Sequence, residues 1–239
     1  MINEQIIIIL TLFFTGIVQS VIGVGILLFG TPILLLIGFN YFDVLNILLP
    51  VSLAVNIFQI SNRIKEIDKN LSKDLFILVL PFVAISLTFA TYINFDFSVA
   101  IGFFLLFLSI SKLINFNINA LIKGKMYLIL MAIIHGITNL GGSLLTGYIS
   151  IKEWDKNKTR TNIAFCYLAF ATTQLITLTI NDKLQLNQYF LVHIFFGLII
   201  FFFTNKLIFK NIKESHFSKL ISLLLLVFGI ILLTRNLLF

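Results

Sequence analysis

The chain has 239 residues, of which 59% are hydrophobic and only 11% are charged, and its formal net charge is +7. A soluble domain carries roughly 25% charged residues, so this chain has too few charges to cover a soluble surface, and it is too hydrophobic to be disordered. Its apolar runs are continuous rather than alternating, which excludes a membrane β-barrel and predicts an all-α integral membrane protein. The excess of basic residues is typical of loops that orient a membrane protein, and no nucleic-acid partner is expected.

Charge clusters divide the chain into eight apolar runs. A membrane-spanning helix needs about 20 apolar residues, and most of the runs fit one crossing each. The first and the fifth run are longer and are interrupted by glycines, at Gly23 and Gly25 and at Gly141 and Gly142. The runs are 5–37, 44–60, 75–93, 97–114, 126–150, 161–180, 188–205 and 220–238.

Most Lys and Arg residues lie in the linkers 61–74, 112–125, 151–160 and 206–219. Positively charged loops stay on the cytoplasmic side of a membrane, so all four linkers are predicted inside. The run 126–150 must then enter and leave on the same side, and it is too short to cross twice at 1.5 Å per residue. We therefore expect a helical hairpin bent at Asn139–Gly142. A single tilted span is the alternative, and it would place two basic linkers on opposite sides.

The same reasoning makes the run 5–37 a hairpin that enters from the other side, with both chain termini outside. A shift of 116 residues places Gly25 on Gly141 and Asn46-Ile47 on Asn162-Ile163. Each half then holds a hairpin followed by three crossings, so the second half is inverted relative to the first. Such inverted repeats are a recurrent transporter architecture. The sequence predicts repeats over 1–116 and 117–239 within one structural domain.

The polar groups expected deep in the membrane are neutral, because all ten acidic residues lie near span ends or in linkers. This disfavours a cation pump that uses a buried carboxylate. Glycine breaks followed by helix N-termini can hold an anion without a fixed charge, although glycines also serve close helix packing. The candidate substrate-binding residues are Gln19, Gly23, Gly25, Asn56, His135, Asn139, Gly141, Gly142, Ser143 and Thr172.

An enzyme is not expected from these residues. Ser143 lies in no GxSxG motif, and no acidic residue at depth orients a histidine base. The chain shows no Cys/His metal spacing and no phosphate-binding loop, so neither a metal nor another cofactor is expected. Any proton coupling would have to use His135, His193 or the substrate itself.

Two segments resemble the sulfite exporter TauE/SafE family of membrane transporters. They read GIVQSVIGVGILLFGTPILLLIG at 16–38 and AIIHGITNLGGSLLTGYIS at 132–150, and a small polar helix follows each. The duplication and the basic linkers extend the resemblance over the whole chain. It implies transport of sulfite, sulfonates and other organosulfur or carboxylate anions. Family glycines are replaced by Ser20, Ile26, Asn139 and Ser143.

These observations lead us to expect a secondary transporter of a small anion in the bacterial inner membrane, working by alternating access around the two hairpins. A channel-like facilitator for another small solute remains an alternative, and so does a non-transporting membrane scaffold or assembly subunit. The polar hairpin bends would be solvated in a transporter and dry in a scaffold. The sequence leaves the oligomeric state open, a homodimer included.

Overall fold

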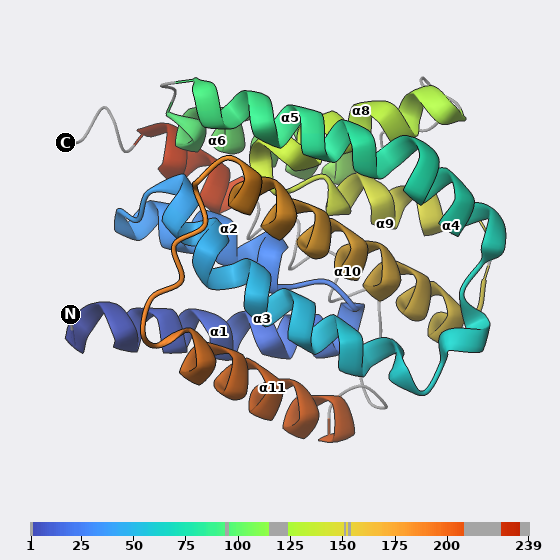
Figure 1. Cartoon of the computed structure of the whole chain (residues 1–239), viewed down its shortest axis with the longest axis horizontal. Helices are drawn as coiled ribbons and strands as arrows, with labels where there is room; N and C mark the ends of the chain where they lie inside the picture. The colour runs from blue at the N-terminus through green and yellow to red at the C-terminus, as the bar shows by residue number, and fades with distance from the viewer. Residues whose placement is uncertain are drawn as a thin grey trace.

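The computed structural model describes residues 2–93, 96–114, 124–150, 152, 154–207 and 226–234, which form helices and no strand (Figure 1). The prediction of an all-helical chain is therefore confirmed for these residues. Residues 226–234 are also helical. The labelled helices are α1 (Ile2–Ile22), α2 (Ile26–Ile37), α3 (Tyr41–Ser61), α4 (Lys69–Asp74), α5 (Leu80–Tyr92), α6 (Phe97–Leu113), α8 (Lys125–Thr138), α9 (Gly142–Ser150), α10 (Lys156–Ile180) and α11 (Phe190–Leu207).

The first apolar run folds into a helical hairpin, as predicted. Helix α1 ends at Ile22, and α2 turns back along it, so that the rings of Phe14 and Phe29 lie edge to face with centroids 6.3 Å apart. At the far end of α2, Gly38 adopts a φ of 112° and its N–H donates to Leu35 O (3.1 Å). This left-handed residue ends the helix and directs the chain into α3.

The run 126–150 is also a hairpin, formed by α8 and α9. The Tyr127 hydroxyl on α8 donates to the backbone oxygen of Leu144 on α9 (2.7 Å), and the rings of Tyr127 and Tyr148 stack with centroids 5.9 Å apart. The helix breaks at Asn139–Gly141, inside the segment where the bend was predicted. The single tilted span considered for this run is therefore wrong.

Within the described residues, three helices are long and apolar enough to cross a membrane by their length and composition, namely 41–61, 69–92 and 156–180. The second of these joins α4 and α5 through a π-helical segment, Leu75–Val79. Helix α10 begins five residues before the apolar run 161–180, because Asp155 caps it by accepting hydrogen bonds from the Asn157 and Lys158 amides (2.9 and 3.0 Å). Arg160 therefore lies in the helix rather than in a linker.

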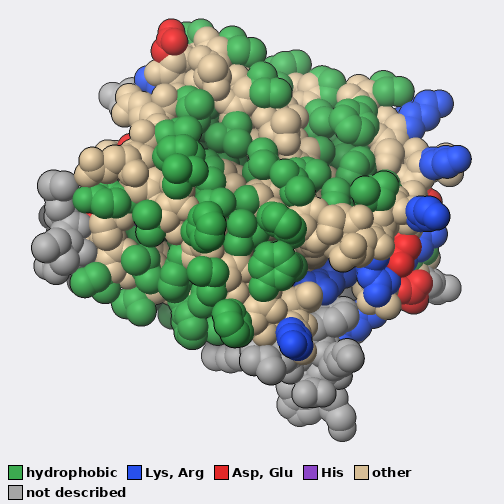
Figure 2. Space-filling model, turned by 60° about the horizontal axis from the view of Figure 1, so that its bottom comes forward, with side chains coloured by type: hydrophobic (Ala, Val, Ile, Leu, Met, Phe, Trp, Pro, Cys, Tyr) green, Lys and Arg blue, Asp and Glu red, His purple; other side chains and the backbone are tan. Residues whose placement is uncertain are grey.

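The described residues of the linkers 61–74 and 151–160 and the start of α8 lie at one end of the molecule. In Figure 1 the connection from α3 to α4, the start of α8 and the start of α10 all lie on the right, and Figure 2 shows Lys and Arg side chains gathered there. We call this the basic end. The opposite end, which we call the distal end, holds the α2–α3, α5–α6 and α10–α11 connections. The linker residues 115–123 and 208–225 lie outside the described residues.

Large apolar side chains cover much of the surface between the two ends (Figure 2). Phe89 on α5 and Phe195 on α11 are 62% and 70% exposed, and Ile85 is similarly exposed. A soluble protein rarely shows such extensive apolar surface, whereas lipid tails solvate it well. The arrangement fits helices that stand side by side in a bilayer, with the central α3 and α10 more enclosed than α5.

Candidate substrate-binding site at the two hairpin bends

Gln19 closes the first bend with its side-chain amide. Its Nε2 lies within hydrogen-bond distance of Gly23 O (3.0 Å), Asn56 Oδ1 (3.1 Å) and Gln59 Oε1 (3.2 Å), and its Oε1 accepts from Ile26 N (3.3 Å). Asn56 Nδ2 donates to the backbone of the preceding turn of α3 (2.8 Å). Gln19 and Asn56 are fully buried. The polar groups at the first bend therefore largely satisfy one another, as buried polar groups do in stable structures.

Arg160 brings a positive charge to the first bend. A Cβ added at Gly23 would lie 2.8 Å from Arg160 Cγ, and Gly23 has a φ of 91°, so both space and backbone conformation favour glycine there. Arg160 Nη2 donates to Asn205 Oδ1 on α11 (2.8 Å), and the guanidinium lies 5.8 Å from the centre of the Phe201 ring. Sequence reasoning placed this arginine in a solvent linker. The capping residue Asp155 was the signal that the helix starts before it.

Gly25 and Gly141 let the two arms of each hairpin approach closely. A Cβ added at Gly25 would lie 2.5 Å from Thr15 O, and a Cβ added at Gly141 would lie 2.6 Å from Met131 O. Real Cβ atoms do not approach backbone this closely. The shift of 116 residues relates Gly25 to Gly141 and also relates their contacts, Thr15 and Met131. Helix packing therefore accounts for these two glycines, whether or not a substrate also approaches them.

The backbone turns in the same way at both bends. Gly23 N donates to Gln19 O (2.9 Å), and Asn139 N donates to His135 O (2.8 Å). The residue that donates has a positive φ in both cases, 91° at Gly23 and 61° at Asn139. Asparagine is among the few residues besides glycine that adopt this conformation readily. The replacement of glycine by asparagine thus preserves the turn and adds a side-chain amide.

That amide connects the second bend to the first hairpin, because Asn139 Nδ2 donates to Thr31 Oγ1 on α2 (3.0 Å). On the other side, α10 presents Tyr167, Phe170 and Gln174 along one face. The His135 ring lies 4.3 Å from the Phe170 ring and 6.0 Å from the Tyr167 ring, measured between centroids. His135, Tyr167 and Gln174 are fully buried. The second bend is therefore enclosed by α2 and α10.

We call His135, Asn139, Tyr167 and Gln174 the second-bend cluster. Six of its buried polar atoms make no hydrogen bond of good geometry among the described residues: both His135 ring nitrogens, the Tyr167 hydroxyl, both polar atoms of the Gln174 amide, and Asn139 Oδ1. The Gln174 amide lies close enough to His135 for a weaker hydrogen bond between the two side chains. Buried polar groups are rarely left without partners, so a cluster of such atoms is typical of a site that binds a polar ligand. This cluster is the part of the interior best suited to bind a small polar molecule.

The structure divides the predicted site residues into two groups. Gln19, Gly23, Gly25 and Asn56 belong to the first bend, whereas His135, Asn139, Gly141, Gly142 and Ser143 belong to the second. None of the hydrogen bonds among the described residues joins one group to the other. Thr172 joins neither, since it is exposed and its hydroxyl donates to Leu168 O (2.8 Å). Tyr167 and Gln174 are not among the predicted site residues, and their helical spacing with Phe170 is the sequence signal that places them on one face of α10.

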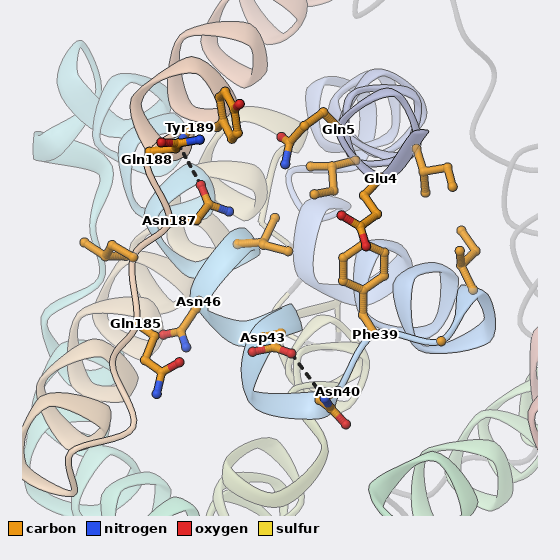
Figure 3. Close-up of a pocket in the computed structure, with 16 residues that line it drawn as sticks. Glu4, Gln5, Phe39, Asn40, Asp43, Asn46, Gln185, Asn187, Gln188 and Tyr189 are labelled. Carbon is orange, nitrogen blue, oxygen red and sulfur yellow. Dashed lines mark hydrogen bonds between the residues drawn. The ribbon is translucent and has the colours of Figure 1, made fainter. Parts of the chain in front are cut away.

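A cavity of about 900 Å³ lies at the distal end, away from both bends (Figure 3). Residues from the start of α1, the α2–α3 connection and the α10–α11 connection line it, and none of its lining residues is Lys or Arg. Asn46 on α3 borders it, so the cavity reaches a residue of a central helix. Its polar lining includes Glu4, Gln5, Asn40, Asp43, Asn46 and Gln185.

Two asparagines related by the shift of 116 residues make unequal contacts. At the basic end, Asn162 on α10 donates through Nδ2 to Glu66 O (3.0 Å) and accepts through Oδ1 from Asp68 N (2.8 Å). At the distal end, Asn46 on α3 donates through Nδ2 to Lys183 O (3.0 Å), but its Oδ1 has no partner among the described residues. Both polar groups of the Asn162 side chain are therefore hydrogen-bonded across the basic end, whereas only Nδ2 of Asn46 is hydrogen-bonded at the distal end.

The family model for "Sulfite exporter TauE/SafE" matches residues 8–232. No curated protein and no solved structure matches the chain. The matched region includes both hairpins, which confirms the resemblance of the two glycine-containing segments. A match over nearly the whole chain, together with apolar helices long enough to span a bilayer, shows that this multi-pass membrane protein belongs to the sulfite exporter TauE/SafE family of transporters.

Proposed function

We propose that the chain is a secondary transporter of a small anion, namely sulfite, a sulfonate or another organosulfur or carboxylate compound. Family membership supports a sulfur-containing anion. The charges support an anion as well, because no Asp or Glu is among the buried side chains of the described residues, while Arg160 lies beside the first bend. Its proposed location is the bacterial inner membrane.

The architecture that we propose is a pair of inverted repeats, 1–116 and 117–239. The common turn at Gly23 and Asn139 supports it, and so does the common close approach at Gly25 and Gly141. Helix packing follows the same relation, since α1 packs on α11 and α8 packs on α5. Helices α1 and α8 are the first arms of the two hairpins, and each packs on a helix of the other half of the chain. The shift of 116 residues places α1 on α8 and α5 on α11. Exchange of this kind suits two halves that move against each other.

The unequal hydrogen bonding of the Asn46 and Asn162 side chains is the observation that best supports alternating access. The complete contact at Asn162 closes the basic end, while the half-made contact at Asn46 borders a cavity at the distal end. We propose that in the opposite state Asn46 makes the complete contact at the distal end and Asn162 makes only half of its contact at the basic end. Positively charged loops stay cytoplasmic, so the described state is open to the outside, with the N-terminus and the C-terminus on that side.

Cysteine labelling tests this mechanism. The substitution Gln185→Cys places a thiol on the exposed lining of the cavity, and the natural cysteine, Cys166, is buried. Asn162→Ala removes the two hydrogen bonds that join α10 to the α3–α4 connection, about 1–3 kcal/mol in total. Labelling by a hydrophilic maleimide should therefore slow, by up to about a hundredfold at the upper value. Asn46→Ala weakens the opposite state more and should leave labelling unchanged or faster.

Equal slowing of labelling by both asparagine variants would contradict the exchange of contacts.

Substrate binding needs a separate measurement, for which thermal stability is suitable because a ligand at a hundredfold excess over its Kd stabilises the folded state by about 2.7 kcal/mol. The ligands to screen are sulfite, thiosulfate, taurine, sulfoacetate and simple carboxylates. A protein that none of these stabilises, and whose labelling none of them alters, is a scaffold rather than a transporter of such anions.

A further inference from the structure

We infer that the second-bend cluster binds its anion together with one proton, so that a hydrogen-bearing anion such as hydrogen sulfite is taken and a fully deprotonated dianion is not. This inference rests on the proposed function, because it assigns the form of the substrate at one of its bends. The observation behind it is the mixture of buried donors and acceptors on His135, Tyr167 and Gln174 that make no hydrogen bond of good geometry among the described residues.

The cluster offers acceptors as well as donors in any orientation of its side chains. A neutral imidazole presents one N–H and one lone pair, and a primary amide presents an NH₂ group and a carbonyl oxygen. Rotating the His135 ring or the Gln174 amide by half a turn exchanges the positions of these groups but not their number. The Tyr167 hydroxyl can donate or accept. None of these acceptors receives a hydrogen bond of good geometry from a described residue, so a donor on the ligand can satisfy at least one of them.

An anion without hydrogen cannot supply that donor. A dianion such as sulfite offers only acceptor oxygens, and the rings that pack on His135 among the described residues, Tyr167 and Phe170, bring no positive charge to balance it. An acceptor left unsatisfied at a buried site weakens binding. Hydrogen sulfite offers one O–H or S–H and several oxygens, and it carries one charge less into a low-dielectric site.

The proton can lie on the ligand or on His135 without changing the atoms or the total charge of the complex. In one arrangement the ligand keeps its hydrogen and donates it to His135 or Gln174. In the other, the hydrogen moves to His135, which becomes an imidazolium beside a sulfite dianion. Tyr167 is the titratable side chain on α10 that faces this ring, and the other facing groups, Phe170 and Gln174, do not titrate. Both arrangements contain the same atoms and the same total charge, so binding takes up one proton per dianion.

The pH dependence of affinity tests this inference. Binding of total sulfite to the purified, full-length protein should weaken tenfold per pH unit at pH values above the second pKa of sulfurous acid, where the dianion dominates. Sulfate is an acceptor-only dianion over the same range and should compete at least a hundredfold less well than sulfite at pH 6. An affinity that stays constant from pH 6 to pH 8.5 would overturn the inference.

Variants of α10 locate the site. Tyr167→Phe and Gln174→Leu should each weaken sulfite binding by about 2- to 13-fold, the ratio expected for one net hydrogen bond, while the pH slope remains. The matched control is Thr179→Val, because Thr179 is exposed on the same helix and its hydroxyl donates to Leu175 O. Unchanged affinity in both cluster variants would overturn the assignment. Failure of every anion to bind at any pH would instead overturn the proposed function.

Discussion

Gln19 and His135 occupy related positions of the two hairpins, but among the described residues Gln19 makes hydrogen bonds of good geometry and His135 makes none, so the same substitution should have opposite effects at the two sites. Gln19→Leu leaves Asn56 Oδ1 and Ile26 N without their partner, and both groups are fully buried. An unsatisfied buried group costs about 1–3 kcal/mol, so the expected loss of stability is about 2–6 kcal/mol. His135→Leu removes two ring nitrogens that make no hydrogen bond of good geometry among the described residues and should leave stability unchanged or raise it by about 1–3 kcal/mol.

Cys166 provides the assay, since it is the single cysteine of the chain and it is buried. A thiol-reactive dye therefore reports unfolding during a temperature ramp. At about 2–4 °C per kcal/mol for a chain of this size, Gln19→Leu should lower the midpoint by roughly 5–20 °C. The His135→Leu variant should melt at or above the parent and lose its stabilisation by sulfite. Equal destabilisation of the two variants would refute the distinction between a structural first bend and a ligand-binding second bend.

Three further predictions concern packing, topology and pH. Gly25→Ala and Gly141→Ala should each greatly reduce the yield of monodisperse protein, because the added Cβ would overlap the backbone of the opposite hairpin arm; normal yields would contradict the close approach. Cysteines introduced in 61–74 and 151–160 should both be protected from an impermeant reagent added outside intact cells, and labelling of only one would contradict their common side. The Lys158 and Asn157 amides hold the pKa of Asp155 below its ordinary value, so this cap stabilises the fold above the unfolded-state pKa and is lost as pH falls through the folded-state value. In thermal unfolding, Asp155→Asn should therefore show a smaller loss of stability than the parent between pH 6 and pH 3.

The sequence by itself determined the class of protein and the course of the chain. Apolar runs bounded by lysine and arginine predict membrane helices, because burying charge in a bilayer is costly. The basic linkers on both sides of 126–150 further required that this run return to the side it entered, and the structure contains that hairpin. Both bends lie at glycine or asparagine positions, where the chain can adopt a positive φ. These features depend on local composition and on the order of charges along the chain.

Only the tertiary structure decided which polar side chains face one another. Helix α10 carries polar residues around much of its circumference, so its sequence does not show that Tyr167 and Gln174 face His135 while Thr172 is exposed. The unequal contacts of Asn46 and Asn162 could not be predicted either, because the shift of 116 residues relates the two asparagines and the sequence does not show which partners each of them meets. Side-chain partners depend on the rotation and depth of each packed helix, and these are fixed by contacts between segments far apart in the chain.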